Sequence, residues 1–115
     1  MNNITYEIAK RFTKYPGPRY IEEGEYSGEL FRKTELMPTI IEAKKNNHKI
    51  ILNLDGTSGY GTSFIEEVFG GLIREEKMSI KEIYSIFTFI SKEDENLIDD
   101  ITEYMEEAEK NSKRR

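Results

Sequence analysis

The sequence predicts an α/β fold, with a small mixed sheet of about four strands covered by helices. Short apolar segments typical of strands alternate along the chain with longer segments of helical periodicity. The length of 115 residues fits one domain. The seven tyrosines and six phenylalanines argue against a disordered chain. We expect one domain over residues 1–110, followed by a frayed basic tail over residues 111–115.

The N-terminal third is predicted to contain two strands and the start of a capped helix. Apolar side chains alternate from Ile4 onward, which predicts a strand over residues 4–12. The run YPGP then forces a turn, and residues 19–23 follow as a second short strand. Ser27 has the position of a helix N-cap. Pro38 must interrupt or kink this helix, because proline has no amide hydrogen to donate, and a new helical stretch can start there with Pro38 at its first position.

A strand, a glycine-rich loop and a helix follow one another in the centre of the chain. KIILNL, residues 49–54, is short and β-branched, as expected of a buried strand. The loop GTSGYGTS, residues 56–63, contains three glycines. Ser63 and Glu66 fit the S-x-x-E capping box of a helix start. On this interpretation, Ser63→Ala costs about 1 kcal/mol of stability.

The last third is predicted to contain a further strand and a final helix. Gly70 and Gly71 interrupt the helix that begins at Ser63, at a cost of about 1 kcal/mol each relative to alanine. Close approach of a neighbouring backbone would explain them. Residues 79–84 are predicted to form one helical turn, and SIFTFI, residues 85–90, a strand. Ser91 is predicted to cap the final helix, whose apolar stripe extends to residue 108.

Composition and charge exclude several classes of function. The formal net charge of −5 disfavours nonspecific nucleic-acid binding, which needs a cationic surface. The chain has no cysteine, and His48 is its only histidine, so we expect no metal site and no bound cofactor. No apolar run is long enough for a membrane span, and no signal peptide is visible. We therefore expect a cytoplasmic protein.

The glycine-rich loop resembles a phosphate-binding loop only in outline. A helix N-terminus presents N–H groups that favour anions, but the loop contains no lysine. Because the sequence also shows no nucleophile–base pair, we expect the protein not to be an enzyme.

The segment IILNLDGTSGYGTSFIEEVFGGL resembles the core of the STAS-like domain family of unknown function, which is related to STAS domains and anti-sigma-factor antagonists. The helix start SGELFR, residues 27–32, resembles the same family, and the resemblance spans residues 20–108. It is strongest at eight positions: Asn53, Asp55, Gly56, Ser63, Phe64, Glu66, Glu67 and Phe69. The resemblance implies a STAS-like fold.

The resemblance also implies a partner and a modification. In antagonists, a serine that opens the helix is phosphorylated by a partner kinase with a GHKL-type ATPase fold, and the matching residue here is Ser63. The implied function is that of a phosphorylatable antagonist, or another partner of such a kinase or ATPase, in bacterial or phage regulation.

The predicted partner-binding residues lie on the loop and the helix that follows it: Asp55, Gly56, Tyr60, Gly61, Thr62, Ser63 and Glu67. Ser27, Arg32 and Arg74 are secondary candidates. Structural explanations compete with these roles: Ser63 and Ser27 as caps, Asp55 as a strand terminus, Arg32 as a helix surface residue, and Glu67 as the partner of Arg74 or Arg32. Tyr60 is predicted to be an exposed interface aromatic that can be removed with little loss of stability.

The sequence is compatible with two classes of function. The first is a non-catalytic regulatory module that binds a protein through the loop and the helix start. The alternative is a small-ligand or nucleotide sensor that uses residues 56–63 and the helix N-terminus. An exposed hydroxyl suffices for the first, whereas the second needs a pocket beside the loop. A homo-oligomer has no support in the sequence.

Overall fold

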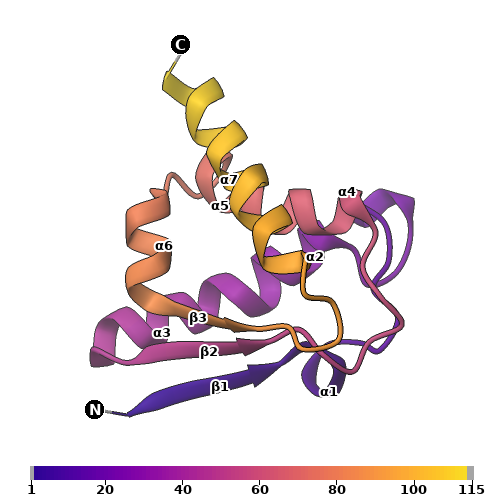
Figure 1. The fold of residues 1–115 in the computed structure, drawn as a ribbon, viewed down its shortest axis with the longest axis horizontal. Helices are drawn as coiled ribbons and strands as arrows, with labels where there is room; N and C mark the ends of the chain where they lie inside the picture. Colours follow the sequence, from indigo (N-terminus) through magenta and orange to yellow (C-terminus); the bar gives the residue numbers. More distant parts are fainter. Residues whose placement is uncertain (1, 114–115) are drawn as a thin grey trace.

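A computed structural model describes residues 2–113 and contains a parallel sheet of three strands. The strands lie side by side in chain order, β1 Asn3–Glu7, β2 Lys49–Asn53 and β3 Phe87–Ile90 (Figure 1). In the register of the sheet, Ile4 lies opposite Ile50, and Ile50 lies opposite Phe87. All three strands therefore end at the same edge, at the right of Figure 1.

Two long helices that each contain a π-helical turn pack above the sheet. The first helix runs over residues 28–46 and the second over residues 62–74. The first consists of α2 Gly28–Phe31, the π-turn η2 Arg32–Leu36 and α3 Met37–Asn46; the second consists of α4 Thr62–Ile65, the π-turn η3 Glu66–Gly70 and α5 Gly71–Arg74. The remaining helices are α1 Ile8–Arg11, the 3₁₀ turn η1 Ile21–Glu23, α6 Ile80–Ile86 and α7 Leu97–Lys113.

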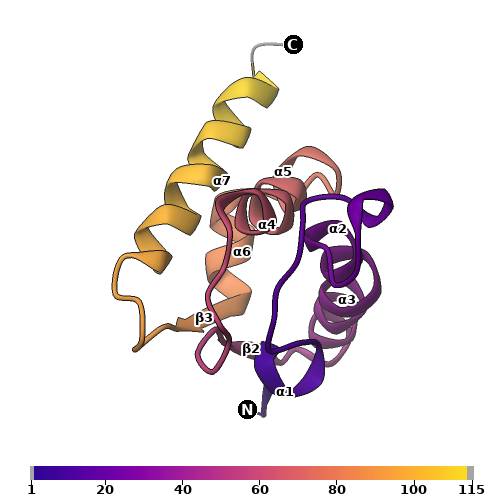
Figure 2. The ribbon, with the colours of Figure 1, turned by 90° about the vertical axis from the view of Figure 1, so that its right-hand side faces the viewer.

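The sheet buries one face against the helices. Tyr6, Ile50 and Leu52 are at most 1% exposed, whereas Thr5 and Thr88 on the opposite face are exposed. Figures 1 and 2 show the main helices on this buried side. The period-2 alternation of a strand thus gives a two-layer domain, and the predicted α/β class is confirmed.

The sheet has three parallel strands, rather than about four strands in a mixed sheet. Residues 19–23 form no strand, because acidic side chains accept from the backbone N–H groups that a strand would use. The N–H of Tyr20 donates to Glu23 at 2.9 Å, and that of Ile21 donates to Glu29 at 3.0 Å. These bonds hold the segment in the 3₁₀ turn instead.

Three element boundaries differ from the prediction. The strand predicted over residues 4–12 ends at Glu7, where α1 begins. Ser85 and Ile86 belong to α6, whose Ser79 cap accepts from Glu82 N–H, so β3 starts at Phe87.

The third boundary is the start of the last helix. Ser91 donates to the carbonyl of Asp94 in a turn, and α7 begins only at Leu97. It continues to Lys113, and the last two residues of the predicted basic tail lie outside the described part of the chain.

Pro38 lies near the start of a new α-helical stretch, as predicted, and the preceding π-turn joins this stretch to α2 without a break. Pro38 occupies the first turn of α3, directly after the π-turn η2. A π-turn inserts one residue into the helical ladder, which is a known way for a helix to accommodate a local disturbance. The helix ends at Asn46, and Asn47 follows in the left-handed conformation with φ 56°, which is typical of the residue after a helix end.

Candidate functional site

A buried ion pair joins the two long helices at their π-turns. Arg32 Nη1 donates to Glu67 Oε2 at 2.6 Å and to the Glu67 carbonyl at 2.8 Å. Arg32 Nε also lies 3.1 Å from Glu76 Oε2. Arg32 is 2% exposed, so the prediction of a helix surface residue is wrong, whereas the predicted pairing with Glu67 is confirmed.

The adjacent glycines of the second helix make room for these charged side chains. A Cβ on Gly71 would collide with the Arg32 guanidinium, and one on Gly70 would collide with the Glu66 carboxylate. The close backbone approach predicted for this pair occurs instead at Gly28, whose added Cβ would lie 2.6 Å from the Phe64 carbonyl oxygen. The missing side chains of Gly70 and Gly71 therefore make room for charged side chains, whereas the sequence predicted room for a neighbouring backbone.

A second, more exposed network surrounds this pair. Glu66 forms ion pairs with Arg19 and Arg74. Burial acts to raise the pKa of Glu66, but hydrogen bonds from the two arginines outweigh it and hold the pKa below its usual value. Three of the predicted site residues, Arg32, Glu67 and Arg74, thus meet in a network that joins helices.

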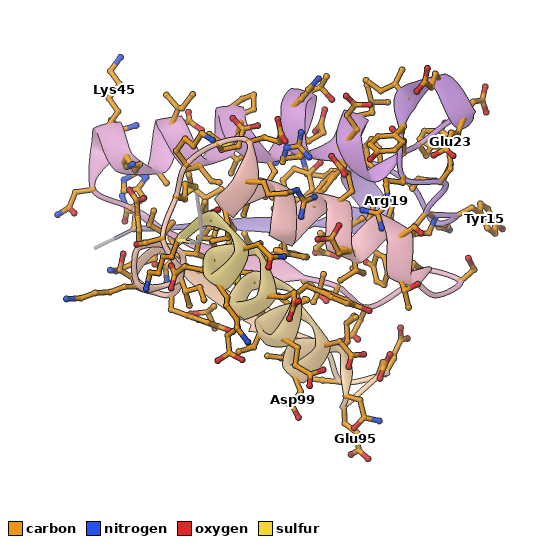
Figure 3. The ribbon with its side chains drawn as sticks, turned by 90° about the horizontal axis from the view of Figure 1, so that it is seen from above. Tyr15, Arg19, Glu23, Lys45, Glu95 and Asp99 are labelled. Atoms are coloured by element: carbon orange, nitrogen blue, oxygen red, sulfur yellow. The ribbon has the colours of Figure 1, made fainter. Side chains whose placement is uncertain are left out.

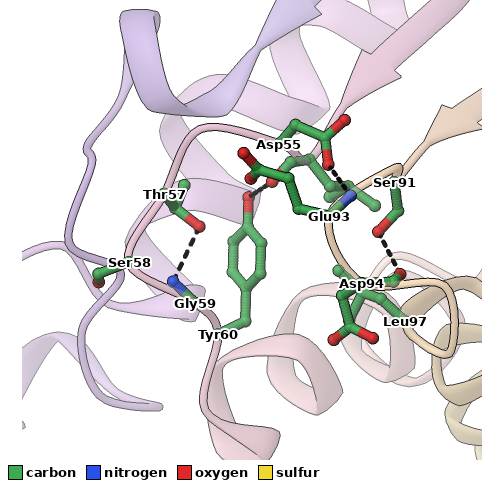
Figure 4. Close-up of a pocket in the computed structure, with 10 residues that line it drawn as sticks. Asp55, Thr57, Ser58, Gly59, Tyr60, Ser91, Glu93, Asp94 and Leu97 are labelled. Atoms are coloured by element: carbon green, nitrogen blue, oxygen red, sulfur yellow. Dashed lines mark hydrogen bonds between the residues drawn. The ribbon is translucent and has the colours of Figure 1, made fainter.

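The loop after β2 is clamped to the loop after β3. Asp55 accepts hydrogen bonds from the N–H groups of Lys92 and Glu93, each at 3.0 Å. In return, the N–H of Gly56 donates to Glu93 Oε1 at 2.7 Å. These contacts are possible because parallel strands end at one edge (Figure 4). Asp55 therefore has a structural role beyond ending a strand.

Tyr60 is a packed residue, not the exposed aromatic that was predicted. Its hydroxyl donates to the Leu54 carbonyl at 2.8 Å, and its ring centroid lies 5.7 Å from that of Phe64. Burial raises the pKa of Tyr60 to about 12, so the hydroxyl keeps its proton at neutral pH. The flanking glycines predicted a flexible loop, but the Tyr60 ring packs against the core and holds the loop in place.

We expect Tyr60→Ala to lower the free energy of unfolding by about 2–4 kcal/mol, because it removes a large packed ring and a hydrogen bond. Tyr60→Phe keeps the ring and should lose about 1 kcal/mol. Tyr15→Ala is the matched control, since Tyr15 is 71% exposed, and it should stay within about 0.5 kcal/mol of the parent. Urea unfolding of the three variants tests this; equal losses in Tyr15→Ala and Tyr60→Ala would contradict it.

The second helix starts without the capping box predicted for it. Gly61 is the N-cap residue, no side chain caps this end, and Ser63 is the second residue of α4. Glu66 is held by arginines and does not reach back to the helix start. Thr62 and Ser63 are exposed. Ser27, in contrast, is a cap as predicted, and its hydroxyl accepts from Leu30 N–H at 3.0 Å.

The two serines therefore make a matched pair. Ser27→Ala should lower the free energy of unfolding by about 1 kcal/mol, because it removes an observed cap. Ser63→Ala should change it by less than about 0.5 kcal/mol, which replaces the loss expected from the sequence. Chemical denaturation midpoints measure both effects, and a larger loss in Ser63→Ala than in Ser27→Ala would show that the Ser63 side chain caps the second helix after all.

A cavity of about 420 Å³ opens between the two clamped loops. Figure 2 faces the edge where the strands end, and Figure 4 shows the cavity. Its lining comes from both loops: Leu54, Asp55, Thr57, Ser58, Gly59, Tyr60, Ser91, Glu93, Asp94 and Leu97. Ligands of open α/β sheets bind beyond the carboxyl ends of the strands, and this cavity lies on that side, although the order β1-β2-β3 has no point where the strand order reverses.

The sequence did not single out Leu54 at the end of β2, or the four lining residues of the loop after β3, Ser91, Glu93, Asp94 and Leu97. The available signal was the parallel arrangement of β2 and β3, which brings the loops after them together.

Among residues 2–113, no group of three or more histidine, aspartate or glutamate side chains is placed to hold a metal ion. No helix in this part of the chain has both the length and the apolar character that a bilayer span requires.

Comparison with known families gives a match to the STAS-like domain of unknown function over residues 29–97. Comparisons with curated proteins and with solved structures give no significant match. The matched range includes β2, β3, both long helices except Gly28, and the two loops of the cavity. The chain therefore belongs to the family of STAS-like domains of unknown function.

Proposed function

We propose that the protein is a non-catalytic regulatory module that binds a protein partner at the edge where the strands end. We define the loop face as residues 54–63 together with residues 91–97. Family membership supports a regulatory or protein-interaction role. The observation that carries the placement is the open start of the second helix. An added Cβ on Gly59 or Gly61 would meet no atom within 4 Å, and Ser63 is exposed.

Ser63 is the residue that we propose a partner kinase phosphorylates. Its hydroxyl does not cap the helix, so a kinase can modify it without breaking a capping bond. A phosphate at the second helical position would be favoured by the helix dipole. The GHKL-type fold of that kinase rests on the likeness to anti-sigma-factor antagonists. Incubation with such a kinase should label the parent protein and leave Ser63→Ala unlabelled; label in both would place the site elsewhere.

The alternative function is that of a small-ligand sensor, and its ligand would bind in the cavity on the loop face. Its lining carries the carboxylates of Asp55, Glu93 and Asp94 and no arginine or lysine. Such a lining repels the phosphates of a nucleotide. The geometry therefore supports a protein partner over a nucleotide.

A bulky side chain at Gly61 tests the proposed function without disturbing the fold. Gly61 has φ −71°, which any residue adopts, and open space around it. We expect Gly61→Trp to block the partner, whereas Glu107→Trp, at an exposed position on α7, should not. Both variants should keep the parent's free energy of unfolding within about 1 kcal/mol.

The measurement is affinity capture from the cells that naturally make the protein, with quantification of the captured proteins. The proposal predicts at least one protein that is enriched with the parent and Glu107→Trp and lost with Gly61→Trp. Loss with Glu107→Trp alone, or identical capture by all three, would refute the placement.

A further inference from the structure

The cavity on the loop face combines an aromatic wall with negative charge. The ring of Tyr60 forms one wall, and the buried side chains of Leu54 and Leu97 contribute apolar surface. The carboxylates of Glu93 and Asp94 lie in the other lining loop, where both residues are exposed (Figure 4). An aromatic face next to carboxylates is the environment that binds a guanidinium or ammonium group.

We propose that this cavity receives an arginine or lysine side chain of the protein partner. This inference rests on the proposed function and names the chemistry of its partner. The aliphatic stem of such a side chain packs on Tyr60 and the leucines, while its charged end reaches Glu93 and Asp94. Each of these carboxylates accepts one backbone N–H, from Gly56 and Asn96 respectively, and a carboxylate has further acceptor sites.

An exposed aromatic side chain beside the cavity points to a protein, rather than a free small cation. Tyr15 is 71% exposed, the highest value among the exposed large hydrophobic side chains of the described residues. The carbonyl of the preceding residue, Lys14, accepts from the N–H of Ser58, which lines the cavity. Figure 3 shows Tyr15 projecting outward at this end of the molecule. Exposed aromatic residues of this kind are enriched in protein interfaces.

Charge complementarity supports the same partner. Beyond Glu93 and Asp94, Glu95 continues the acidic character of the loop, and Asp99 follows in the first turn of α7 (Figure 3). The whole chain carries a formal net charge of −5. A basic segment of a partner would therefore be attracted to this end of the domain before contact.

The test uses three probes and nuclear magnetic resonance titration of the labelled full chain at low salt. The probes are N-acetyl-arginine amide, the neutral isostere N-acetyl-citrulline amide, and the pentapeptide acetyl-Gly-Leu-Arg-Leu-Gly-amide. We expect arginine amide to shift the backbone signals of residues 54–60 and 91–97 below about 50 mM. Citrulline amide should bind about tenfold more weakly. The pentapeptide should bind more tightly than arginine amide, because its leucines reach Tyr15.

Two double variants and one single variant test which side chains bind the probes. Glu93→Gln combined with Asp94→Asn removes two charges but keeps the oxygens that accept from Gly56 and Asn96, and should weaken both cationic probes about fivefold or more. The charge-matched Glu106→Gln/Glu107→Gln, on exposed α7 positions, should not. Tyr15→Ser should weaken only the pentapeptide.

Several results would overturn the inference: equal binding of arginine and citrulline amides, shifts confined to other surfaces, no shift at 50 mM, or unchanged affinity in the Glu93/Asp94 variant. Equal affinity of arginine amide and the pentapeptide would assign the cavity to a small cation instead of a partner protein. If cellular capture still depends on Gly61 while the probes fail, this inference is wrong and the proposed function stands.

Discussion

Arg32→Met should lower the free energy of unfolding by about 3–5 kcal/mol, the largest loss that we expect from any single change. Arg32 is 2% exposed and is the partner of Glu67, which is 4% exposed. Removing Arg32 takes from the buried Glu67 carboxylate its closest partner and leaves it only longer contacts to Arg19 and Arg74, each 3.5 Å. Glu76 also loses its contact with Arg32 Nε. Equilibrium unfolding in urea measures the loss, with the same m-value, the dependence of the unfolding free energy on urea concentration, used for the parent and the variant.

A double-mutant cycle separates the ion pair from the packing of the long side chain. Arg32→Met/Glu67→Met removes both charges, and we expect it to be more stable than Arg32→Met alone, because the buried carboxylate that has lost its closest partner is removed as well. Lys33→Met is the neighbouring control. Its ammonium is exposed and pairs with Glu29 on the surface, so the change should stay within about 0.5 kcal/mol. A loss below about 1 kcal/mol for Arg32→Met would contradict a buried pair at this helix crossing.

Gly28→Ala should cost about 1–3 kcal/mol, although alanine is ordinarily better than glycine in a helix. Its Cβ would lie 2.6 Å from the Phe64 carbonyl oxygen, which belongs to the backbone of the second long helix. A backbone atom cannot rotate away as the end of a side chain can, so the two helices must separate. The thermal midpoint of unfolding measures the effect.

Gly61→Ala is the matched control for Gly28→Ala. Both residues lie at a helix start, but a Cβ on Gly61 meets nothing within 4 Å. We therefore expect Gly61→Ala to change stability by less than about 1 kcal/mol. Similar losses in both variants would mean that the cost lies in the backbone conformation of the helix starts, and not in the helix crossing.

The positions of the central strand and of the second helix could be predicted because their signals are local. Residues 49–54 form an apolar β-branched run, and the glycine-rich loop separates that run from a segment of helical period. The Ser27 cap was predictable for the same reason, since a cap depends on residues within one turn. The family resemblance of residues 50–72 added the fold, and the match over residues 29–97 agrees with it.

The burial of Arg32 and the packing of Tyr60 could not be predicted, because both depend on contacts that form only when the chain folds. Arg32 meets Glu67 across 35 positions, and the acceptor of Tyr60, the Leu54 carbonyl, becomes available only when the loop folds back. An arginine on a polar helix and a tyrosine between glycines both look exposed until those partners are placed. The prediction of the capping box was wrong for another reason: its residues are present, but the helix has Gly61 and not Ser63 as its N-cap, and Glu66 pairs with arginines.

Only one of the two loops that form the loop face was predicted from the sequence. Asp55 and the glycines belong to the loop after β2, which the sequence analysis singled out. The second half, around Glu93 and Asp94, follows a different strand and is joined to the first through Asp55 and the backbone N–H groups of Lys92 and Glu93. Knowledge that β2 and β3 are neighbours in a parallel sheet is needed to bring the halves together.

Hydrogen-exchange mass spectrometry of the parent protein, alone and with its captured partner, tests most directly whether function lies on the loop face. Bound partner should slow exchange at the backbone amides of residues 54–63 and 91–97, and leave the exposed α7 positions of residues 103–110 unchanged. The same experiment with Gly61→Trp should show no slowing. Protection centred on residues 103–110, or on the exposed face of the sheet around Thr5 and Thr88, would contradict the account and place the interface on another surface.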